Sequence, residues 1–517
     1  MKNILFLILI SPSIFAQDAD LLIRNGKIID GTGNSWYYGD VAIKDGKILQ
    51  VGKLGNITST KTIDATGLII APGFIDVHAH IEGEETKTPT ADNFIFDGVT
   101  TVVTGNCGSS RTDISEYLSF IDSLKLSINV ATLIGHNGVR RAVMGTANRA
   151  PTPEEQQLMQ GIVAKAMQDG AVGLSTGLIY IPGTYSRTEE IVGLAGITSQ
   201  HHGIYATHMR SESDSVTNAI NEALLIGREA NIPVEISHFK VSGQQNWKRS
   251  TETLALIQEA RKQGIDVTID QYPYTASSTS MSTMVPEDIL ADGNDSIQAR
   301  LQRPELRKYV IDKMLAGLKK RGLKHFSYAV VANHRADTTL NGKTIEAINL
   351  LKGKKHKARF EAETVIELML QGGAQMVFHG MSEWDVINIM KYPYNMFASD
   401  AGIRAFGQGV PHPRGYGTNA RVLSRYVRDQ KILTLEEAIR RMTSLPAQKF
   451  QLKERGILKE GMAADIVVFN EHEVKDKSTF EAPHAYSEGF RFIVVNGELV
   501  VENSMHTGVR SGKALRK

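Results

Sequence analysis

Short apolar runs alternate with helical patterns through the middle of the chain. This alternation predicts a parallel sheet, because each parallel strand needs a crossover before the next strand begins. Eight candidate strands can be counted, which is the number in a (β/α)8 barrel. They end near His80, Cys107, His136, Leu178, His208, His238, Tyr274 and Asp400. The pattern therefore predicts an α/β fold, with a (β/α)8 barrel over residues 71–445.

The two ends of the chain carry a shorter, β-like pattern. Turn pairs, Asn25-Gly26 and Asp45-Gly46, stand between apolar runs near the N-terminus and predict two hairpins. Residues 464–500 repeat the order of strand, turn and strand. A sheet shared by both ends is the simplest arrangement, so we expect a small β-sandwich domain built from residues 17–70 and 446–517.

Helix start and stop signals lie between the predicted strands. Thr152 and Glu155 have the spacing of a capping box, and Gly170 stands where that helix should end. Thr434 and Glu437 repeat the capping-box spacing.

Residues 275–395 are longer than one strand and helix unit requires. The segment holds Lys/Arg-rich stretches at 300–324 and 352–357 around a short β-like run at 328–332. We expect an insertion after the seventh strand, at about residues 280–360, above the C-terminal ends of the strands. It could act as a lid or be a surface decoration with solvated charges, and the pattern does not separate these two roles.

Charge and composition favour small-molecule chemistry. Lys and Arg number 58 and Asp and Glu number 56, so the chain has no field that would attract nucleic acid or a membrane surface. Cys107 is the only cysteine, which excludes an intramolecular disulfide. Nothing in the pattern indicates an oligomeric state.

The N-terminal segment has the layout of a secretory signal peptide. Lys2 precedes an apolar run at residues 4–10, and small residues follow up to Ala16. The run is too short to span a bilayer, and no other segment resembles a membrane span. We expect residues 1–16 to be removed and the mature chain, without a membrane span, to be exported to the periplasm or outside the cell.

Two histidines end the first predicted strand. His78 and His80 lie two residues apart and so share one face, where they offer two imidazoles to a single ion. Taken alone, this pair is equally consistent with polar side chains that face water.

Further ligand-type side chains stand at other strand ends. The C-terminal strand ends of a barrel meet at one mouth, where active sites lie. A lone buried cysteine or histidine is usually a packing residue, but six ligand-type residues in barrel order predict a metal site. They are His78, His80, Cys107, His208, His238 and Asp400.

The motifs at these positions resemble those of the amidohydrolase superfamily and, more closely, the N-acyl-D-amino-acid deacylases. The resemblance covers nearly the whole chain after residue 16, and Asn106-Cys107-Gly108 at the second strand end is its discriminating piece. No lysine occurs in residues 171–178, the fourth predicted strand, which speaks against the branch with a carboxylated lysine. The other matching segments are residues 72–80, 97–105, 173–180, 207–211, 237–240, 271–274 and 412–414.

The resemblance implies zinc-dependent hydrolysis of the amide bond of N-acyl-D-amino acids, which releases a carboxylate and a D-amino acid. It implies a tight zinc held by Cys107, His208 and His238, and thiolate and imidazole ligands suit that ion. A second, weaker position would use His78, His80, Cys107 and Asp400. Asp400 would also act as general base and then as general acid.

On the substrate side, the resemblance implies that Lys240 and Arg414 lie near the substrate carboxylate. Tyr272 and Ser278 match polar pocket residues of the family. Either cation could instead be a solvated surface charge. Phe239 interrupts the His-His-Lys pattern of the family, so the acyl and side-chain preferences stay open.

Two alternatives remain at this point. The same metal site could hydrolyse another amide, such as a dipeptide or a cyclic amide. The barrel could also have lost catalysis and serve as a binding protein, although the complete ligand set with Asp400 argues against that loss.

Overall fold

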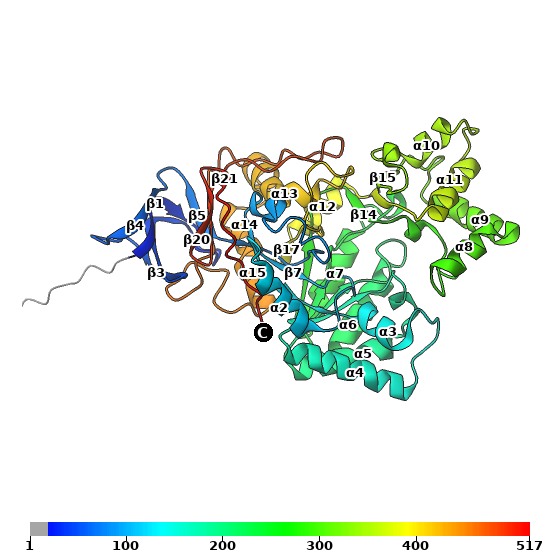
Figure 1. Cartoon of the computed structure of the whole chain (residues 1–517), viewed down its shortest axis with the longest axis horizontal. Helices are drawn as coiled ribbons and strands as arrows, with labels where there is room; N and C mark the ends of the chain where they lie inside the picture. Colours follow the sequence, from blue (N-terminus) through cyan, green and yellow to red (C-terminus); the bar gives the residue numbers. More distant parts are fainter. Residues whose placement is uncertain (1–18) are drawn as a thin grey trace, which may run out of the picture.

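The computed structural model describes residues 19–517, and within them eight strand positions form a parallel barrel at the centre of the molecule (Figure 1). The predicted (β/α)8 barrel is confirmed. Its strands are β6 (Phe74–Asp76), β7 (Val99–Thr104), β8 (Asn129–Thr132) with β9 (Ile134–Gly135), β10 (Gly173–Gly177), β11 (Ile204–His208), β12 (Val234–Ile236), β13 (Val267–Gln271) and β17 (Asn395–Phe397).

The barrel is closed between the chain that follows β6 and the chain that follows β17. The backbone N–H of His80 donates to the Ala401 carbonyl at 2.9 Å, and Ala79 and Ala401 form a parallel bridge. The hydrogen-bonded order then runs from β6 through β7 and β8, and from β9 through β13 to β17. Inside the barrel, Ile75, Val103 and Met396 belong to one buried apolar cluster, so the interior is a packed core.

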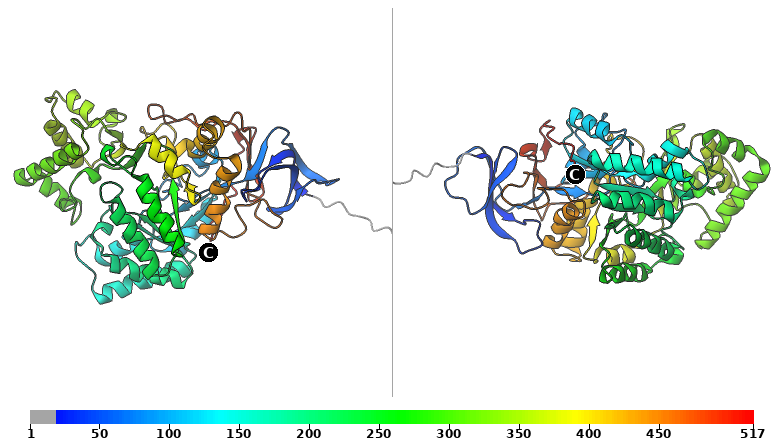
Figure 2. Two further views of the ribbon diagram at one scale, coloured as in Figure 1. Left: turned by 180° about the vertical axis from the view of Figure 1, so that it is seen from behind. Right: turned by 90° about the horizontal axis from the view of Figure 1, so that it is seen from below.

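Helices cover the outside of the barrel (Figure 2). On α6, buried residues recur every three or four positions at Val216, Ile220, Ala223 and Gly227, which is the spacing of one helix face. The helices of this part are α1 (Asp92–Ile95), α2 (Ile114–Leu124), α3 (His136–Met144), α4 (Pro153–Gln168), α5 (Thr188–Gln200), α6 (Val216–Glu229), α7 (Ser250–Lys262), α12 (Glu383–Met390), α13 (Arg414–Arg421), α14 (Leu435–Met442) and α15 (Ser444–Lys449). None of the helices in residues 19–517 is both long and apolar enough to cross a membrane. The predicted signal peptide, residues 1–16, lies outside the described residues.

The helix caps follow the sequence signals with one exception. Thr152 and Glu155 form the full capping box of α4, and Gly170 follows the helix with a positive φ of 112°. Thr434 caps α14 by accepting the Glu437 N–H. The Glu437 carboxylate instead accepts hydrogen bonds from the guanidinium groups of Arg440 and Arg441.

Strands from both chain ends share one sheet at one end of the molecule (Figure 1). β3 also contacts the segment before β18 through a bridge between Lys47 and Ala463, so the sheet folds back over a buried apolar cluster that includes Ile43 and Ile466. The sheet order is β21-β20-β19-β18-β5-β1-β2-β3, with β4 paired to β1. The strands are β1 (Ala19–Ile28), β2 (Tyr37–Lys44), β3 (Lys47–Gly52), β4 (Ser59–Asp64), β5 (Ile69–Pro72), β18 (Ile466–Phe469), β19 (Phe490–Val495), β20 (Glu498–Glu502) and β21 (Met505–His506).

One of the two predicted N-terminal hairpins is wrong. Asp45-Gly46 does join β2 to β3 with positive φ at both residues, as a two-residue hairpin requires. Asn25-Gly26, however, lies inside β1, where the register with β2 shifts. Asn25 adopts a φ of 63°, so the pair forms an irregularity in one continuous strand.

The insertion after the seventh strand occupies residues 276–379, which is wider than the expected 280–360. β14 (Ala276–Ser280) and β15 (Ala329–Asn333) both pair antiparallel with β16 (Gln375–His379), so the sheet of the insertion includes residues beyond the expected limits. The insertion has its own buried apolar cluster and lies at the end opposite the nine-stranded sheet (Figures 1 and 2). Its helices are α8 (Asn294–Gln302), α9 (Pro304–Lys320), α10 (Ile345–Leu351) and α11 (Ala358–Leu370).

Gly73 joins the terminal sheet to the first barrel strand, and we predict that Gly73→Ala destabilises the protein. A Cβ at this position would overlap the side chain of Thr100 on β7. Overpacking of this kind costs about 1–3 kcal/mol, so the midpoint of urea denaturation should fall. Gly161→Ala in α4 is the matched control, because a Cβ there has no atom within 4 Å. An unchanged midpoint for Gly73→Ala would contradict the tight fit of β6 against β7.

Candidate metal centre and active site

Each of the six predicted ligand residues lies at or just after the C-terminal end of a barrel strand. His208 is the last residue of β11, while the other five follow β6, β7, β12 and β17 within four residues. Cys107, His238 and Asp400 have positive φ values of 52°, 36° and 49°. Non-glycine residues rarely adopt this conformation, and such strain clusters at functional sites, where the surrounding structure holds it in place.

The structure brings Cys107, His208 and His238 together at distances that suit one zinc ion. The Cys107 Sγ lies 3.6 Å from His208 Nδ1 and 3.6 Å from His238 Nε2. Usual zinc–sulfur and zinc–nitrogen bond lengths at a tetrahedral angle separate the two ligand atoms by about 3.6 Å. The three residues therefore fit a tetrahedral zinc ion and leave its fourth position free for another ligand.

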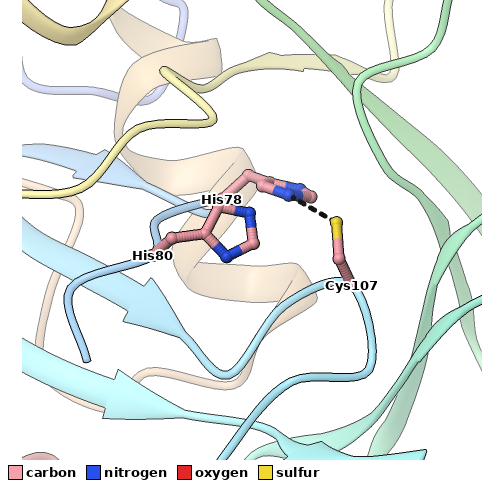
Figure 3. A group of neighbouring side chains, drawn as sticks. All are labelled: His78, His80 and Cys107. Atoms are coloured by element: carbon pink, nitrogen blue, oxygen red, sulfur yellow. Dashed lines mark hydrogen bonds between the residues drawn. The ribbon is translucent and has the colours of Figure 1, made fainter. Parts of the chain in front are cut away.

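A second group shares the cysteine. The Cys107 Sγ lies 3.3 Å from His78 Nε2, and Figure 3 shows His78 and His80 beside it. The Asp400 Oδ1 lies 3.2 Å from His80 Nε2 and 3.6 Å from His78 Nε2. His78, His80 and Cys107 can meet at one position, which shares Cys107 with the first group, and Asp400 can meet His78 and His238 beside it.

Burial prepares the histidines to act as neutral ligands. It lowers the pKa of His78 to about 3, and it also lowers the pKa values of His208 and His238. Burial, together with the charges of Asp400 and Glu212, raises the pKa of the Cys107 thiol well above its usual value. Without a metal ion the thiol therefore stays protonated at neutral pH, while the imidazoles carry free lone pairs.

Asp400 is a buried carboxylate held in its ionised form. Burial alone would raise its pKa, but the neighbouring Arg414 and the site histidines lower it well below the usual value. The Arg414 Nη1 lies 2.9 Å from Asp400 Oδ2. Asp400 is thus a base that faces the proposed metal position with one oxygen and Arg414 with the other.

Buried carboxylates orient the ligand residues from behind. Asp76 accepts the backbone N–H of His78, and Asp270 accepts the backbone N–H of His238. Glu212 lies 2.8 Å from His238 Nδ1, on the ring side opposite Cys107. Of these three contacts, that of Glu212 is to the ring, where a carboxylate fixes the orientation of a metal-binding histidine and raises its basicity. Those of Asp76 and Asp270 hold the backbone in place.

A cavity of about 560 Å³ opens onto this centre. Cys107 and Asp400 lie in its wall, and so do the two predicted substrate residues Ser278 and Arg414. The Arg414 Nη2 donates to the Ser278 carbonyl at 3.3 Å. The side chain of Tyr272 is buried just behind, where its ring contacts the Arg414 guanidinium 4.5 Å from the ring centroid.

Lys240 differs from the expectation, because its ammonium does not reach the cavity. Its Nζ lies 2.5 Å from Glu212 Oε1, 2.8 Å from His238 Nδ1 and 2.7 Å from the His238 carbonyl. The Glu212 carboxylate and the His238 carbonyl accept two of the three N–H donors of this lysine. The structure therefore places Lys240 behind the predicted ligand His238, away from the position expected for a substrate carboxylate.

Sequence reasoning missed three residues of the site. Glu212 follows His208 by four residues. Asp270 lies near the end of β13, which stops at Gln271 and not near Tyr274 as the sequence pattern predicts. Tyr180 packs its ring against His208 at 4.9 Å between centroids and bonds Thr279 of the insertion. The position of Asp270 on a barrel strand could have identified it, whereas Glu212 and Tyr180 stand in loops without a periodic signal.

Comparison with known proteins agrees with this geometry. The model of the amidohydrolase family matches residues 61–501. The chain belongs to the amidohydrolase family. Among its relatives, the D-aminoacylase of Alcaligenes xylosoxydans xylosoxydans is 34% identical over 97% of this chain and 98% of that protein. The N-acyl-D-glutamate deacylase of the same organism is 33% identical over 97% of each chain.

Solved structures of this family match nearly the whole chain. A crystal structure of D-aminoacylase matches with a TM-score of 0.82 at 34% identity, and it covers 96% of this chain and 100% of that chain. The N-acyl-D-glutamate deacylase of Bordetella bronchiseptica, in complex with zinc and a phosphonate inhibitor, matches with a TM-score of 0.83 at 33% identity. That match covers 97% of this chain and 100% of the other.

We predict that zinc binding by this family member releases a proton from Cys107. The raised pKa of the thiol means that zinc must displace its proton, so affinity should rise about tenfold per pH unit between about pH 6 and pH 8. Competition with a chelator at several pH values measures this slope. Cys107→Ser should still fold but bind zinc weakly and lose the slope. Unchanged zinc affinity in Cys107→Ser would remove Cys107 from the metal site.

Proposed function

We propose that this protein is a zinc-dependent hydrolase that cleaves the amide bond of N-acyl-D-amino acids and releases a carboxylate and a D-amino acid. The observation that carries the proposal is the tetrahedral spacing of Cys107, His208 and His238 beside the ionised Asp400. Identity of 33–34% to D-amino-acid deacylases over nearly the whole chain supports the same activity and the D configuration.

In this proposal the tight metal position uses Cys107, His208 and His238. The second, weaker position uses His78, His80, Cys107 and Asp400. A bound zinc ion would lower the pKa of a water molecule and polarise the substrate carbonyl.

Asp400 moves the proton. Its carboxylate accepts a proton from the attacking water, while the water oxygen forms a bond to the carbonyl carbon. The same proton then passes to the amide nitrogen as the carbon–nitrogen bond breaks, so that the amine leaves without a negative charge. The lowered pKa of Asp400 keeps its carboxylate ionised at neutral pH, so that it is unprotonated when the reaction begins.

Arg414 is the proposed partner of the substrate carboxylate. It lines the cavity and presents a planar group that can bind a carboxylate through two hydrogen bonds. Its Nη1 has no hydrogen-bond partner among residues 19–517, despite its ion-pair distance to Asp400. The Ser278 carbonyl accepts a hydrogen bond from this guanidinium, and the Tyr272 ring packs against it. We assign Lys240 to the positioning of His238.

The charge of the cavity favours an acidic amino-acid side chain. Basic side chains outnumber acidic ones in its wall, and fields of one sign in a cleft attract ligands of the opposite sign. The basic residues are Arg141, Arg335, Arg404 and Arg414, and the acidic ones are Glu84 and Asp400. A second carboxylate on the substrate would therefore be accommodated better than an apolar group.

A substrate panel tests the function directly. Wild-type protein with zinc should hydrolyse N-acetyl-D-glutamate faster than N-acetyl-D-leucine, and the L forms slowly. Removal of zinc with a chelator should abolish activity, and added zinc should restore it. Asp400→Asn should retain zinc in the tight position but lose about 10²- to 10⁴-fold in kcat. Full activity in metal-free protein, or in Asp400→Asn, would refute the mechanism.

Substitution of Arg414 tests the binding of the carboxylate. Loss of a charge-assisted hydrogen bond costs about 1.5–3 kcal/mol, so Arg414→Ala should lower kcat/KM about 10- to 150-fold. The control is a substrate whose α-carboxylate is replaced by an amide, on which wild type and variant should differ little. Lys240→Ala should instead weaken zinc binding through His238. If Arg414→Ala lowers kcat/KM equally on both substrates, Arg414 acts on Asp400 alone and does not bind the substrate carboxylate.

A further inference from the structure

A second group of ligand-type side chains lies in the insertion, outside the barrel site. His325 precedes β15, Glu346 lies in α10, His356 lies between α10 and α11, and Glu361 lies in α11. One nitrogen or oxygen atom of each residue lies within 4.8 Å of the corresponding atom of the others. In Figure 1, α10 and α11 lie next to each other in the upper part of the insertion.

The four side chains already converge through short contacts. The His325 Nδ1 lies 2.6 Å from Glu361 Oε1 and 3.7 Å from Glu346 Oε1. The His356 Nε2 lies 2.6 Å from the same Glu346 oxygen. Zinc–nitrogen and zinc–oxygen bonds at a tetrahedral angle separate two ligand atoms by about 3.3 Å. To bind one ion, the half-exposed His356 has to rotate out of its stack with His325, which also lengthens its contact with Glu346. The partly exposed His325 has to rotate as well, because its contact with the buried Glu361 is equally short.

The charges in this cluster suit a divalent cation. Glu361 has a fully buried side chain, and Glu346 is mostly buried. Among residues 19–517, no lysine or arginine forms an ion pair with either carboxylate, and their ion-pair partners are His325 and His356. The two imidazole rings stack with centroids 4.1 Å apart, a distance that disfavours a positive charge on both rings. Two carboxylates and two imidazoles thus offer one metal ion two negative charges and four ligand atoms.

We propose that His325, Glu346, His356 and Glu361 bind a divalent transition-metal ion, with zinc as the best match to two nitrogen and two oxygen ligands. With all four protein ligands present, this is a structural site that leaves no position for a substrate. It is independent of the activity proposed for the barrel.

A metal ion here would join separate parts of the insertion next to the larger cavity between the insertion and the barrel. Phe326, which follows His325, lines that cavity and donates its backbone N–H to the Glu361 Oε2 at 2.7 Å. The ion would hold the segment before β15 against α10 and α11. It would therefore stiffen one wall of the approach to the active site.

The test uses the full chain with Cys107→Ser, which removes the shared ligand of the barrel site. Zinc should protect residues 345–370 from hydrogen exchange, and the protection should be lost when His356→Ala or Glu346→Gln is added. His356 is half exposed, so its replacement should not prevent folding. His472→Ala, at an exposed histidine outside the cluster, is the matched control and should keep the protection.

Protection that depends on zinc and on both His356 and Glu346 would support the site. The absence of any zinc effect on residues 345–370, or an effect that survives both substitutions, would overturn it. Zinc that binds without protecting this segment would come from the residual barrel ligands and would also count against the proposal. None of these outcomes depends on hydrolytic activity, so failure here is distinct from failure of the proposed function.

Discussion

The buried carboxylate of Asp76 holds the first and last barrel strands together. It accepts the backbone N–H of His78 at 3.0 Å and that of Ser399 at 3.0 Å. Beside it, the Asp400 N–H donates to the His78 carbonyl at 2.9 Å. Buried backbone donors need partners, because an unpaired one costs about 1–3 kcal/mol. This closure brings Asp400 to His78 and His80 across more than three hundred residues of chain, and the proposed second metal position depends on it.

The buried ionisable groups of the site set one another's protonation states. Burial keeps the imidazoles neutral, whereas Arg414 keeps Asp400 ionised despite its burial. Burial would also raise the pKa of Glu212, but Lys240 and His238 lower it. The Lys240–Glu212 pair therefore lies behind His238 as a compensated charge pair, and it orients the ring that faces Cys107. A change in any of these groups would alter the ligand behaviour of its neighbours.

Much of the fold could be predicted because its signals are local. Apolar periodicity located the eight strands, and Thr152 with Glu155 marked the start of α4. The incorrect predictions also rested on local sequence signals, which contacts with distant residues overrode. Asn25-Gly26 suits a hairpin turn, but pairing with β2 continues on both sides of it. On the other edge of β1, β4 pairs before this dipeptide and β5 pairs after it, so β1 stays in one piece. The insertion was predicted too short because β14 and β16 lie far apart in the sequence. They become neighbours only through their antiparallel pairing in the folded chain.

The sequence by itself determined which side chains can meet, since strand ends in a barrel face one mouth and residue type sets ligand chemistry. The sequence alone could therefore identify the six candidate ligands, His78, His80, Cys107, His208, His238 and Asp400. Only the tertiary structure decided how polar groups pair behind them. Lys240 and Glu212 lie twenty-eight residues apart, and no spacing rule connects two loops whose separation depends on the packing of α6 between β11 and β12. Whether a cation faces a cavity or a buried carboxylate is a property of the folded chain.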